Sequence, residues 1–189
     1  NDKNSRKHFR WLLFNNFVEG DYLVSLTFDN EHIQKSIPER KREFTNYIKC
    51  LRRLYVKNGL ELRYLYVIEG VNDEARFHYH LVVNSGGGKV TRDEVERLWK
   101  CGEHTNSKRL QLDSDGTFTS IAVYLMKSKD TKKKWERSWN GSHNLKRPEI
   151  TTDDNKVSRK TMRKIQDAAR NDEVRVIMSK VYPKFKVID

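Results

Sequence analysis

The chain has 189 residues, a mass of 22.5 kDa and a formal net charge of +12, with a pI near 9.7. This length predicts a single domain over residues 1–189, and the positive charge favours a polyanionic partner, with nucleic acid the first candidate. The chain lacks the run of about 18 apolar residues that a membrane-spanning helix needs. Cys50 and Cys101 stand alone, so they fit a reducing cytoplasm and support neither a disulfide-dense pattern nor zinc-finger chemistry. No signal peptide is visible, so we expect a cytoplasmic location.

The expected elements mix strands and helices along the whole chain. The stretch at 22–28 alternates and is rich in strand formers, whereas apolar residues within 37–58 recur at helical spacing before Gly59. Thr91 and Glu94 form a capping-box pattern, which predicts a short helix. The expected order is a strand at 22–28, a helix within 37–58, strands at 62–70 and 77–84, a helix after 91, a strand at 108–113, helices at 117–129 and 159–170, and strand character at 174–188.

This order predicts an α+β fold in which helices cover one face of an antiparallel sheet. The strand at 77–84 pairs at least with the strand at 62–70, so we expect it near the centre of the sheet. The other face of the sheet is then expected to be open for a groove.

The most informative stretch lies in the strand expected at 77–84, where two histidines flank one tyrosine. Side chains alternate between the faces of a strand, so His78 and His80 point the same way, about 7 Å apart along the strand. Their ring nitrogens can bind one divalent ion, although histidines in a strand also serve packing or hydrogen bonding. The opposite face of the strand is apolar: Phe77, Tyr79, Leu81 and Val83.

Glu69 ends the strand expected at 62–70, which a polar loop at 71–76 joins to the histidine strand. Such a short connection predicts antiparallel neighbours. A carboxylate at the end of an apolar strand is costly unless it is paired or bound to a cation, or is simply the first solvated residue of the turn. If the strands pair, Glu69 lies near His78 and His80. Two imidazoles and one carboxylate suit Mg²⁺ or Mn²⁺ without excluding Zn²⁺.

Tyr124 and Lys127 stand out in the helix expected at 117–129. They lie away from its apolar stripe and are neighbours at i,i+3, so they can address the same point. A neutral phenol is a poor nucleophile, but a nearby ammonium or a metal-bound phosphate favours the phenolate. The alternative is a surface tyrosine followed by an unrelated lysine. The apolar stripe consists of Phe118, Ile121, Ala122 and Leu125.

Together these residues resemble a known family. Glu69 on one strand, His78 and His80 on the next, and Tyr124 with Lys127 on a following helix look like the motifs of single-tyrosine HUH endonucleases. Within that superfamily the chain is most similar to the rolling-circle replication initiators of phages and plasmids. Looser likenesses extend the resemblance over about residues 22–150: a first-strand motif at Ser25–Phe28, a Trp-x-x-Gly motif within Leu98–Gly102, and the segment Ser142–Pro148.

The resemblance implies both a fold and a reaction. The fold is a five-stranded antiparallel sheet with helices packed mainly on one face. His78, His80 and Glu69 would hold Mg²⁺ or Mn²⁺, and Tyr124, assisted by Lys127, would attack a phosphodiester of single-stranded DNA. The product would be a nick with a free 3′-OH and a 5′-phosphotyrosine, made at an origin or its hairpin to initiate rolling-circle replication. The implied partners are that DNA and the host helicase and polymerase, and the chain would be a monomer or a weak oligomer.

Three other interpretations of these residues compete with this one. A nucleotide hydrolase with a His-x-His-x-His strand needs a third histidine where this chain has Val82, so the sequence argues against it. A non-catalytic nucleic-acid binding module would stack bases on its strand aromatics, although such residues are more typical of a core. A transposase or relaxase relative would share the nicking chemistry. The strand aromatics are Tyr64, Tyr66, Phe77 and Tyr79.

Basic segments are expected to contact DNA phosphates and to make binding dependent on salt. Taken one by one, each is also typical of a solvated charged face. They are Arg40–Arg42, Lys132–Lys134 and Arg159–Lys160, and Trp135 and Trp139 near the lysine run are candidates for stacking on an unpaired base.

Overall fold

The computed structural model describes residues 2–70, 77–102, 105–127, 139–149, 157–168 and 171–183. Contacts divide the chain into two compact units, Asn1–Pro148 and Glu149–Asp189, and each unit is described by itself. All residues expected to carry the chemistry lie in the first unit. The single domain expected over residues 1–189 stays a prediction.

Five strands of the first unit form one antiparallel sheet: β1 (Tyr22–Thr27), β2 (Tyr64–Glu69), β3 (His78–Val83), β4 (Thr105–Arg109) and β5 (Trp139–Gly141). Their order across the sheet is β4-β1-β3-β2-β5. Strand β3 is central because it pairs with both β1 and β2. The expected α+β class, the five-stranded antiparallel sheet and the central histidine strand are therefore confirmed.

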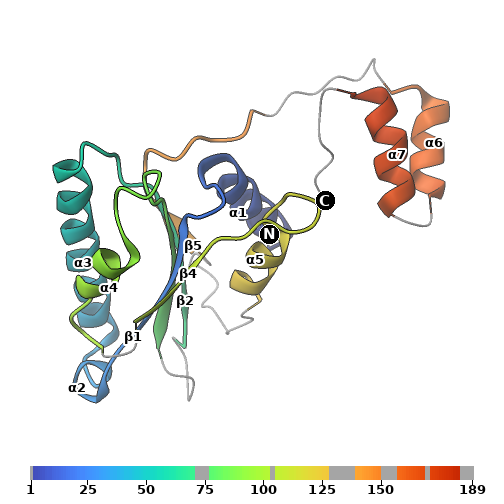
Figure 1. Cartoon of the computed structure of the whole chain (residues 1–189). Helices are drawn as coiled ribbons and strands as arrows, with labels where there is room; N and C mark the ends of the chain where they lie inside the picture. Colours follow the sequence, from blue (N-terminus) through green and yellow to red (C-terminus); the bar gives the residue numbers. More distant parts are fainter. Residues whose placement is uncertain are drawn as a thin grey trace. The chain divides into compact units, whose positions relative to one another are not determined.

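Helix α3 (Ile37–Lys57) covers one face of this sheet (Figure 1). Ser36 and Glu39 form a capping box at its start, and its apolar residues recur at helical spacing on the side that faces the strands. Phe44 stacks on Tyr79 of β3, with ring centroids 4.0 Å apart and planes 5° apart. Two short helices lie on the same side of the sheet: α2 (Asn30–Ile33) and α4 (Arg92–Arg97).

The strand aromatics belong to the core on the α3 side. Phe77 and Tyr79 are buried, and Tyr64 and Tyr66 pack against the same cluster from half-buried positions. Their burial confirms the interpretation of these rings as core. It also removes Phe77 and Tyr79 as platforms for stacking bases.

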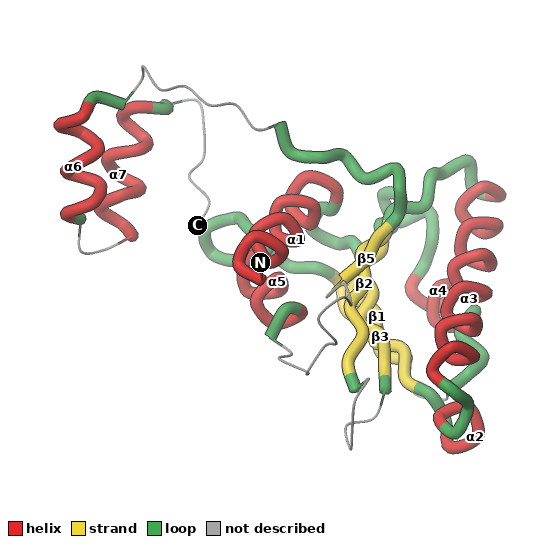
Figure 2. Tube along the Cα trace, turned by 180° about the vertical axis from the view of Figure 1, so that it is seen from behind, coloured by secondary structure: helices red, strands yellow, loops and turns green. Residues whose placement is uncertain are grey.

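Helices α1 (Asp2–Asn16) and α5 (Thr119–Leu125) cover the opposite face of the sheet (Figure 2). Leu65, Val67 and Val82 project to that side and form a second buried cluster. The expectation of an open sheet face is therefore wrong where these helices lie, because strands that are apolar on both faces need cover on both. The helices contribute Phe9, Leu12, Leu13, Ala122 and Leu125 to the cluster.

Several element boundaries differ from the expected ones. Strand β4 begins at Thr105 rather than at 108, and its residues are polar, so no apolar alternation marks them. Helix α5 ends at Leu125 with Met126 as its C-cap, which places Lys127 beyond the helix. Strand β5 falls within a basic segment for which the sequence predicts no regular structure.

The second unit contains two helices among its described residues, α6 (Arg159–Asp167) and α7 (Asn171–Val181), which pack against each other. Helix α6 confirms the expected helix. The strand character expected at 174–188 is wrong for α7, where Val174, Ile177 and Val181 recur at helical spacing and are partly buried while Val176 is exposed. In the described part of the chain, no helix combines the length and the apolar character that crossing a membrane requires.

Candidate metal centre and tyrosine

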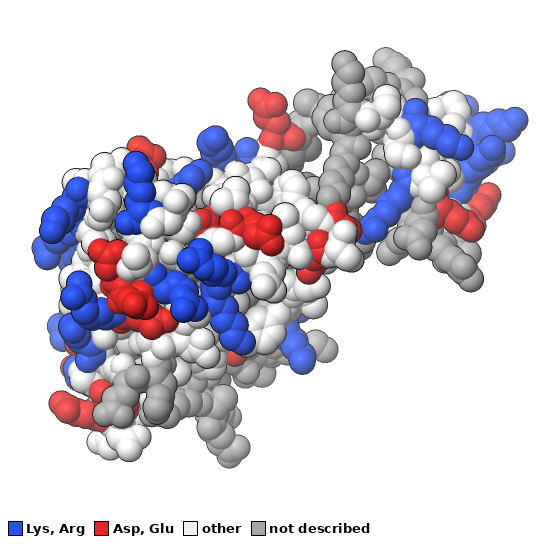
Figure 3. Space-filling view, in the orientation of Figure 1, with Lys and Arg blue, Asp and Glu red and all other residues white. Residues whose placement is uncertain are grey.

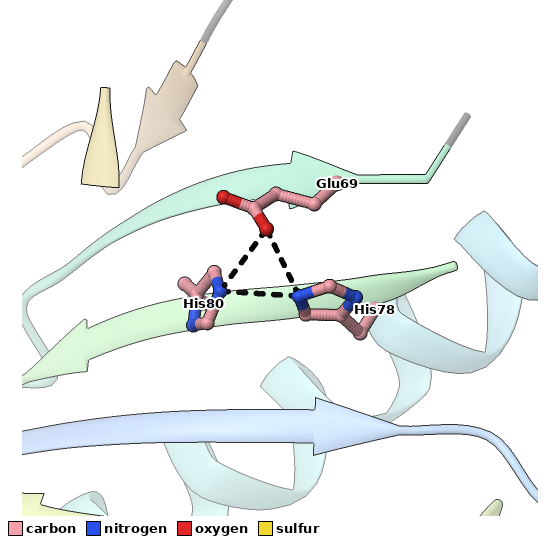
Figure 4. A group of neighbouring side chains, drawn as sticks. All are labelled: Glu69, His78 and His80. Carbon is pink, nitrogen blue, oxygen red and sulfur yellow. Dashed lines mark hydrogen bonds and ion pairs between the residues drawn. The ribbon is translucent and has the colours of Figure 1, made fainter. Parts of the chain in front are cut away.

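Strand register brings the three expected ligands together. Glu69 of β2 lies directly opposite His78 of β3, and Val67 lies opposite His80. Side chains alternate along each strand, so Glu69, His78 and His80 point to the face on which α1 and α5 pack. Figure 4 shows the three side chains converging from the two strands.

The three ligand atoms form a small triangle (Figure 4). Oε2 of Glu69 lies 3.1 Å from Nε2 of His78 and 3.5 Å from Nε2 of His80, and the two Nε2 atoms are 3.1 Å apart. Ligand atoms bound at about 2.1 Å lie about 3 Å apart around an octahedral ion and about 3.4 Å apart around a tetrahedral ion. The spacing and the donor set therefore fit one divalent ion in either geometry. Within the described ranges, this is the one group of three His, Cys, Asp or Glu side chains close enough to share an ion.

The carboxylate of Glu69 is held in its charged form. Hydrogen bonds from His78 and then from His80 lower the pKa of Glu69 to about 2, and they outweigh the partial burial that acts in the opposite direction. His80 is 5% exposed and His78 is 22% exposed, so the group opens to solvent on the His78 side. A negative charge beside two imidazoles at an open strand end is a site that favours a cation.

Ser25 of β1 holds the inner histidine from the other side. It lies opposite His80 in the register, and its Oγ is 3.1 Å from Nδ1 of His80. This contact occupies Nδ1 and leaves Nε2 to face Glu69 and His78. A hydrogen bond of this kind orients a metal-binding imidazole. The sequence places Ser25 in the first-strand motif, but its role emerges only once the pairing of β1 with β3 is known.

Tyr124 of α5 lies beside the candidate metal-binding group. Its ring centroid is 5.6 Å from that of His80, with the two planes at 69°. The apolar stripe of α5 is buried through Ala122 and Leu125, while Tyr124 is 54% exposed. The structure thus brings Tyr124 to the histidines while its ring stays open to solvent, as a group that meets a large substrate must be.

Lys127 is close to Tyr124 along the chain but not on the same helix. Its backbone N–H donates to the carbonyl of Tyr124 at 3.3 Å, and its side chain is exposed. The tight last turn therefore keeps Lys127 beside Tyr124, although the helix expected to carry both ends before it.

The Trp-x-x-Gly motif supports the end of β1, next to the histidine strand. Nε1 of Trp99 donates to the carbonyl of Thr27 at 2.7 Å, and Thr27 pairs with His78. A Cβ atom on Gly102 would lie 2.1 Å from the same carbonyl oxygen, so only glycine fits at this close approach. The motif thus fixes the strand end that borders the outer histidine.

Comparison with protein families places this geometry in a known group. A family model of replication-associated proteins, the ORF2 type, matches residues 21–129, which is more than half of the chain. The chain belongs to this ORF2-type replication-associated family. All five expected site residues lie inside the matched region, and the match supports a protein of replication-initiator type. The comparisons with curated proteins and with solved structures find no match.

The family match ends before the aromatic and basic residues at 132–139. Lys132–Lys134 and Trp135 lie outside the described residues. Trp139 on β5 is half-buried, and its Nε1 donates to the carbonyl and the hydroxyl of Ser5 on α1 at 3.2 and 3.0 Å. The ring also packs edge-on against Phe9. Trp139 therefore serves to join β5 to α1 rather than to present a free face for stacking.

Proposed function

We propose that this member of the ORF2-type replication-associated family is a metal-dependent endonuclease and strand transferase that nicks single-stranded DNA at an origin and so initiates rolling-circle replication. The observation that carries the proposal is the position of Tyr124 against His80 of the Glu69, His78 and His80 group, at 5.6 Å between ring centroids. A phenol beside a cation site is the combination that nucleophilic attack on a phosphodiester requires.

In this proposal each residue has one role. Glu69, His78 and His80 hold Mg²⁺ or Mn²⁺, which when bound supplies a Lewis acid for a phosphate oxygen. The Tyr124 hydroxyl loses its proton and bonds to phosphorus. The bond from phosphorus to the 3′ oxygen breaks, and that oxygen takes up a proton to become the free 3′-OH. The ammonium of Lys127 offsets the negative charge that develops on the phosphoryl group.

The 5′-phosphate stays on Tyr124 as a phosphodiester, so the reaction conserves the number of such bonds. A free 3′-OH can attack the same phosphorus in reverse and rejoin a strand without a nucleotide cofactor. The two products, a primer end for polymerase and a covalently marked 5′ end, are what rolling-circle initiation uses.

The test is covalent capture of DNA. Protein and a randomised single-stranded oligonucleotide library are incubated with Mn²⁺ and separated on a denaturing gel, and any adduct is mapped by peptide mass spectrometry. We expect the adduct on Tyr124. The Tyr124→Phe variant removes one oxygen with little change of shape, so it should bind DNA and form no adduct, whereas Tyr64→Phe on the α3 side should behave as wild type.

Lys127→Ala should slow adduct formation without removing DNA binding, because it takes away charge stabilisation and leaves the nucleophile in place. An adduct on a tyrosine other than Tyr124, or full nicking by Tyr124→Phe, contradicts the proposal.

A further inference from the structure

The outward face of α3 carries a cluster of cations that the nicking site does not use. Lys49, Arg52 and Arg53 are exposed there, one helical turn apart or less, and with Val56 and Lys57 they line a shallow hollow. Figure 3 shows Lys and Arg side chains gathered along the side of the first unit where α3 lies. We call Lys49, Arg52 and Arg53 the α3 cations.

The charge of the α3 cations is not neutralised within the described part of the chain. From Phe44 to its end at Lys57, α3 contains no acidic residue. Glu43 pairs with Lys35 at 3.2 Å. None of the α3 cations forms an ion pair with a carboxylate among the described residues. Three uncompensated charges on one rigid helix form a surface for a polyanion.

The α3 cations and the nicking site lie on opposite faces of the sheet. Helix α3 packs on one face (Figure 1), whereas Glu69, His78 and His80 point to the face of α1 and α5 (Figure 2). The axis of a helix lies about 10 Å from the mid-plane of the sheet on which it packs. The α3 cations therefore cannot touch the phosphate that Tyr124 attacks, and they must meet a different segment of a polyanion.

We propose that the α3 cations bind the phosphate backbone of duplex DNA, separately from the single strand at the nicking site. Surfaces that bind single strands combine cations with exposed aromatic rings on which bases stack. All aromatic residues of α3 are buried against the sheet: Phe44, Tyr47 and Tyr55. A rigid helix with cations and no exposed ring suits the regular backbone of a duplex, where phosphate contacts position a protein without reading sequence.

The proposal goes beyond the nicking reaction and rests on the proposed function only for the choice of DNA as the polyanion. In this proposal the α3 cations bind the duplex that flanks an origin, while the strand to be cut is bound on the face of the sheet where α1 and α5 lie. Each phosphate contact contributes about 0.9 to the slope of log affinity against log salt, so each is worth about fivefold at 0.15 M salt, and three are worth about 100-fold.

The test compares two variants that lose the same three charges. One is Lys49→Gln, Arg52→Gln, Arg53→Gln, and the other is Arg163→Gln, Lys164→Gln, Lys180→Gln on exposed side chains of α6 and α7, outside the basic segments expected to contact DNA. Fluorescence anisotropy measures their binding to a labelled duplex and to a short single strand at several salt concentrations. Metal is absent throughout, so the result does not depend on nicking, and circular dichroism confirms that both variants are folded.

We expect the α3 variant to lose between about tenfold and 100-fold of duplex affinity and to show a salt slope smaller by about 2 to 3. The control variant of α6 and α7 should lose less, and the α3 variant should bind the single strand almost as wild type does. Equal losses in the two variants would assign the effect to net charge and overturn the proposal. An unchanged duplex affinity, or an equal loss toward the single strand, would overturn it as well.

Discussion

The contact between Ser25 and His80 offers a quantitative test of the candidate metal centre. Ser25→Ala removes the hydroxyl that lies 3.1 Å from Nδ1 of His80. Because His80 is 5% exposed, water has little access to replace that hydroxyl. The variant therefore leaves a buried ring nitrogen without its partner and lets the ring turn away from Glu69 and His78.

The expected size of the effect follows from that one hydrogen bond. A neutral hydrogen bond contributes about 0.5–1.5 kcal/mol net, which corresponds to about 2- to 13-fold in an equilibrium constant. Loss of the partner that orients a metal-binding histidine weakens metal binding by about 10- to 100-fold. Both ranges include a loss of about tenfold, so we expect Ser25→Ala to bind Mn²⁺ about tenfold more weakly than wild type does.

Titration of the metal-free protein with Mn²⁺, followed by the electron paramagnetic resonance signal of the free ion, measures this affinity directly. Ser25→Thr keeps the hydroxyl in a residue that suits a strand and should bind Mn²⁺ within about twofold of wild type. Ser107→Ala is the matched control, because Ser107 is a buried serine on β4 whose hydroxyl bonds to Glu96 on the other side of the sheet. It should lower the free energy of unfolding and leave Mn²⁺ affinity unchanged.

Two results would refute the reasoning about Ser25. One is a Ser25→Ala protein that binds Mn²⁺ as tightly as wild type. The other is a Ser107→Ala protein that loses as much affinity as Ser25→Ala, since the loss would then reflect general loosening of the sheet.

Four further predictions concern the same part of the molecule. His78→Ala should abolish Mn²⁺-dependent cleavage with an unchanged circular dichroism spectrum, and cleavage at the wild-type rate would exclude His78 as a ligand. In metal-free buffer, Glu69 should stabilise the fold fully above its ordinary pKa of 4.5, and this contribution should disappear as the pH falls toward the folded-state pKa of about 2. Urea unfolding should therefore show that wild type and Glu69→Gln differ less in stability at about pH 3 than at about pH 6, and a constant difference would contradict the assignment. Tyr79→Phe removes a buried hydroxyl that has no partner among the described residues, so thermal unfolding should show equal stability or a gain of up to about 1 kcal/mol rather than a loss. Gly102→Ala should lower the free energy of unfolding by about 1–3 kcal/mol, because its Cβ would meet the carbonyl of Thr27 at 2.1 Å. An unchanged melting temperature would show that the end of β1 moves to make room for the added Cβ.

The grouping of Glu69, His78 and His80 could be predicted because it depends on local rules. The period of two along a strand puts His78 and His80 on one face, and a short connection between neighbouring strands brings Glu69 beside them. The apolar stripe of α5 similarly predicts that Tyr124 stays exposed, which the structure confirms.

Features that depend on distant contacts could not be predicted in the same way. Ser25 meets His80 only through the pairing of β1 with β3, which no local pattern encodes. Helix α1 has an apolar stripe interrupted by many charges, so its role as a cover for the sheet depends on the strands that it packs against. Helix α7 is rich in β-branched residues, and packing against α6 outweighs their preference for strands.

The region that matches the family and the compact first unit have different boundaries. The match covers residues 21–129, yet Phe9, Leu12 and Leu13 of α1 close the apolar face formed by Leu65 and its neighbours and pack beside α5. A protein trimmed to the matched region would expose that face to water and leave the tyrosine helix without its neighbour. The helix before the first strand is therefore part of the packing that holds Tyr124 in place, although it lies outside the segment by which the family is recognised.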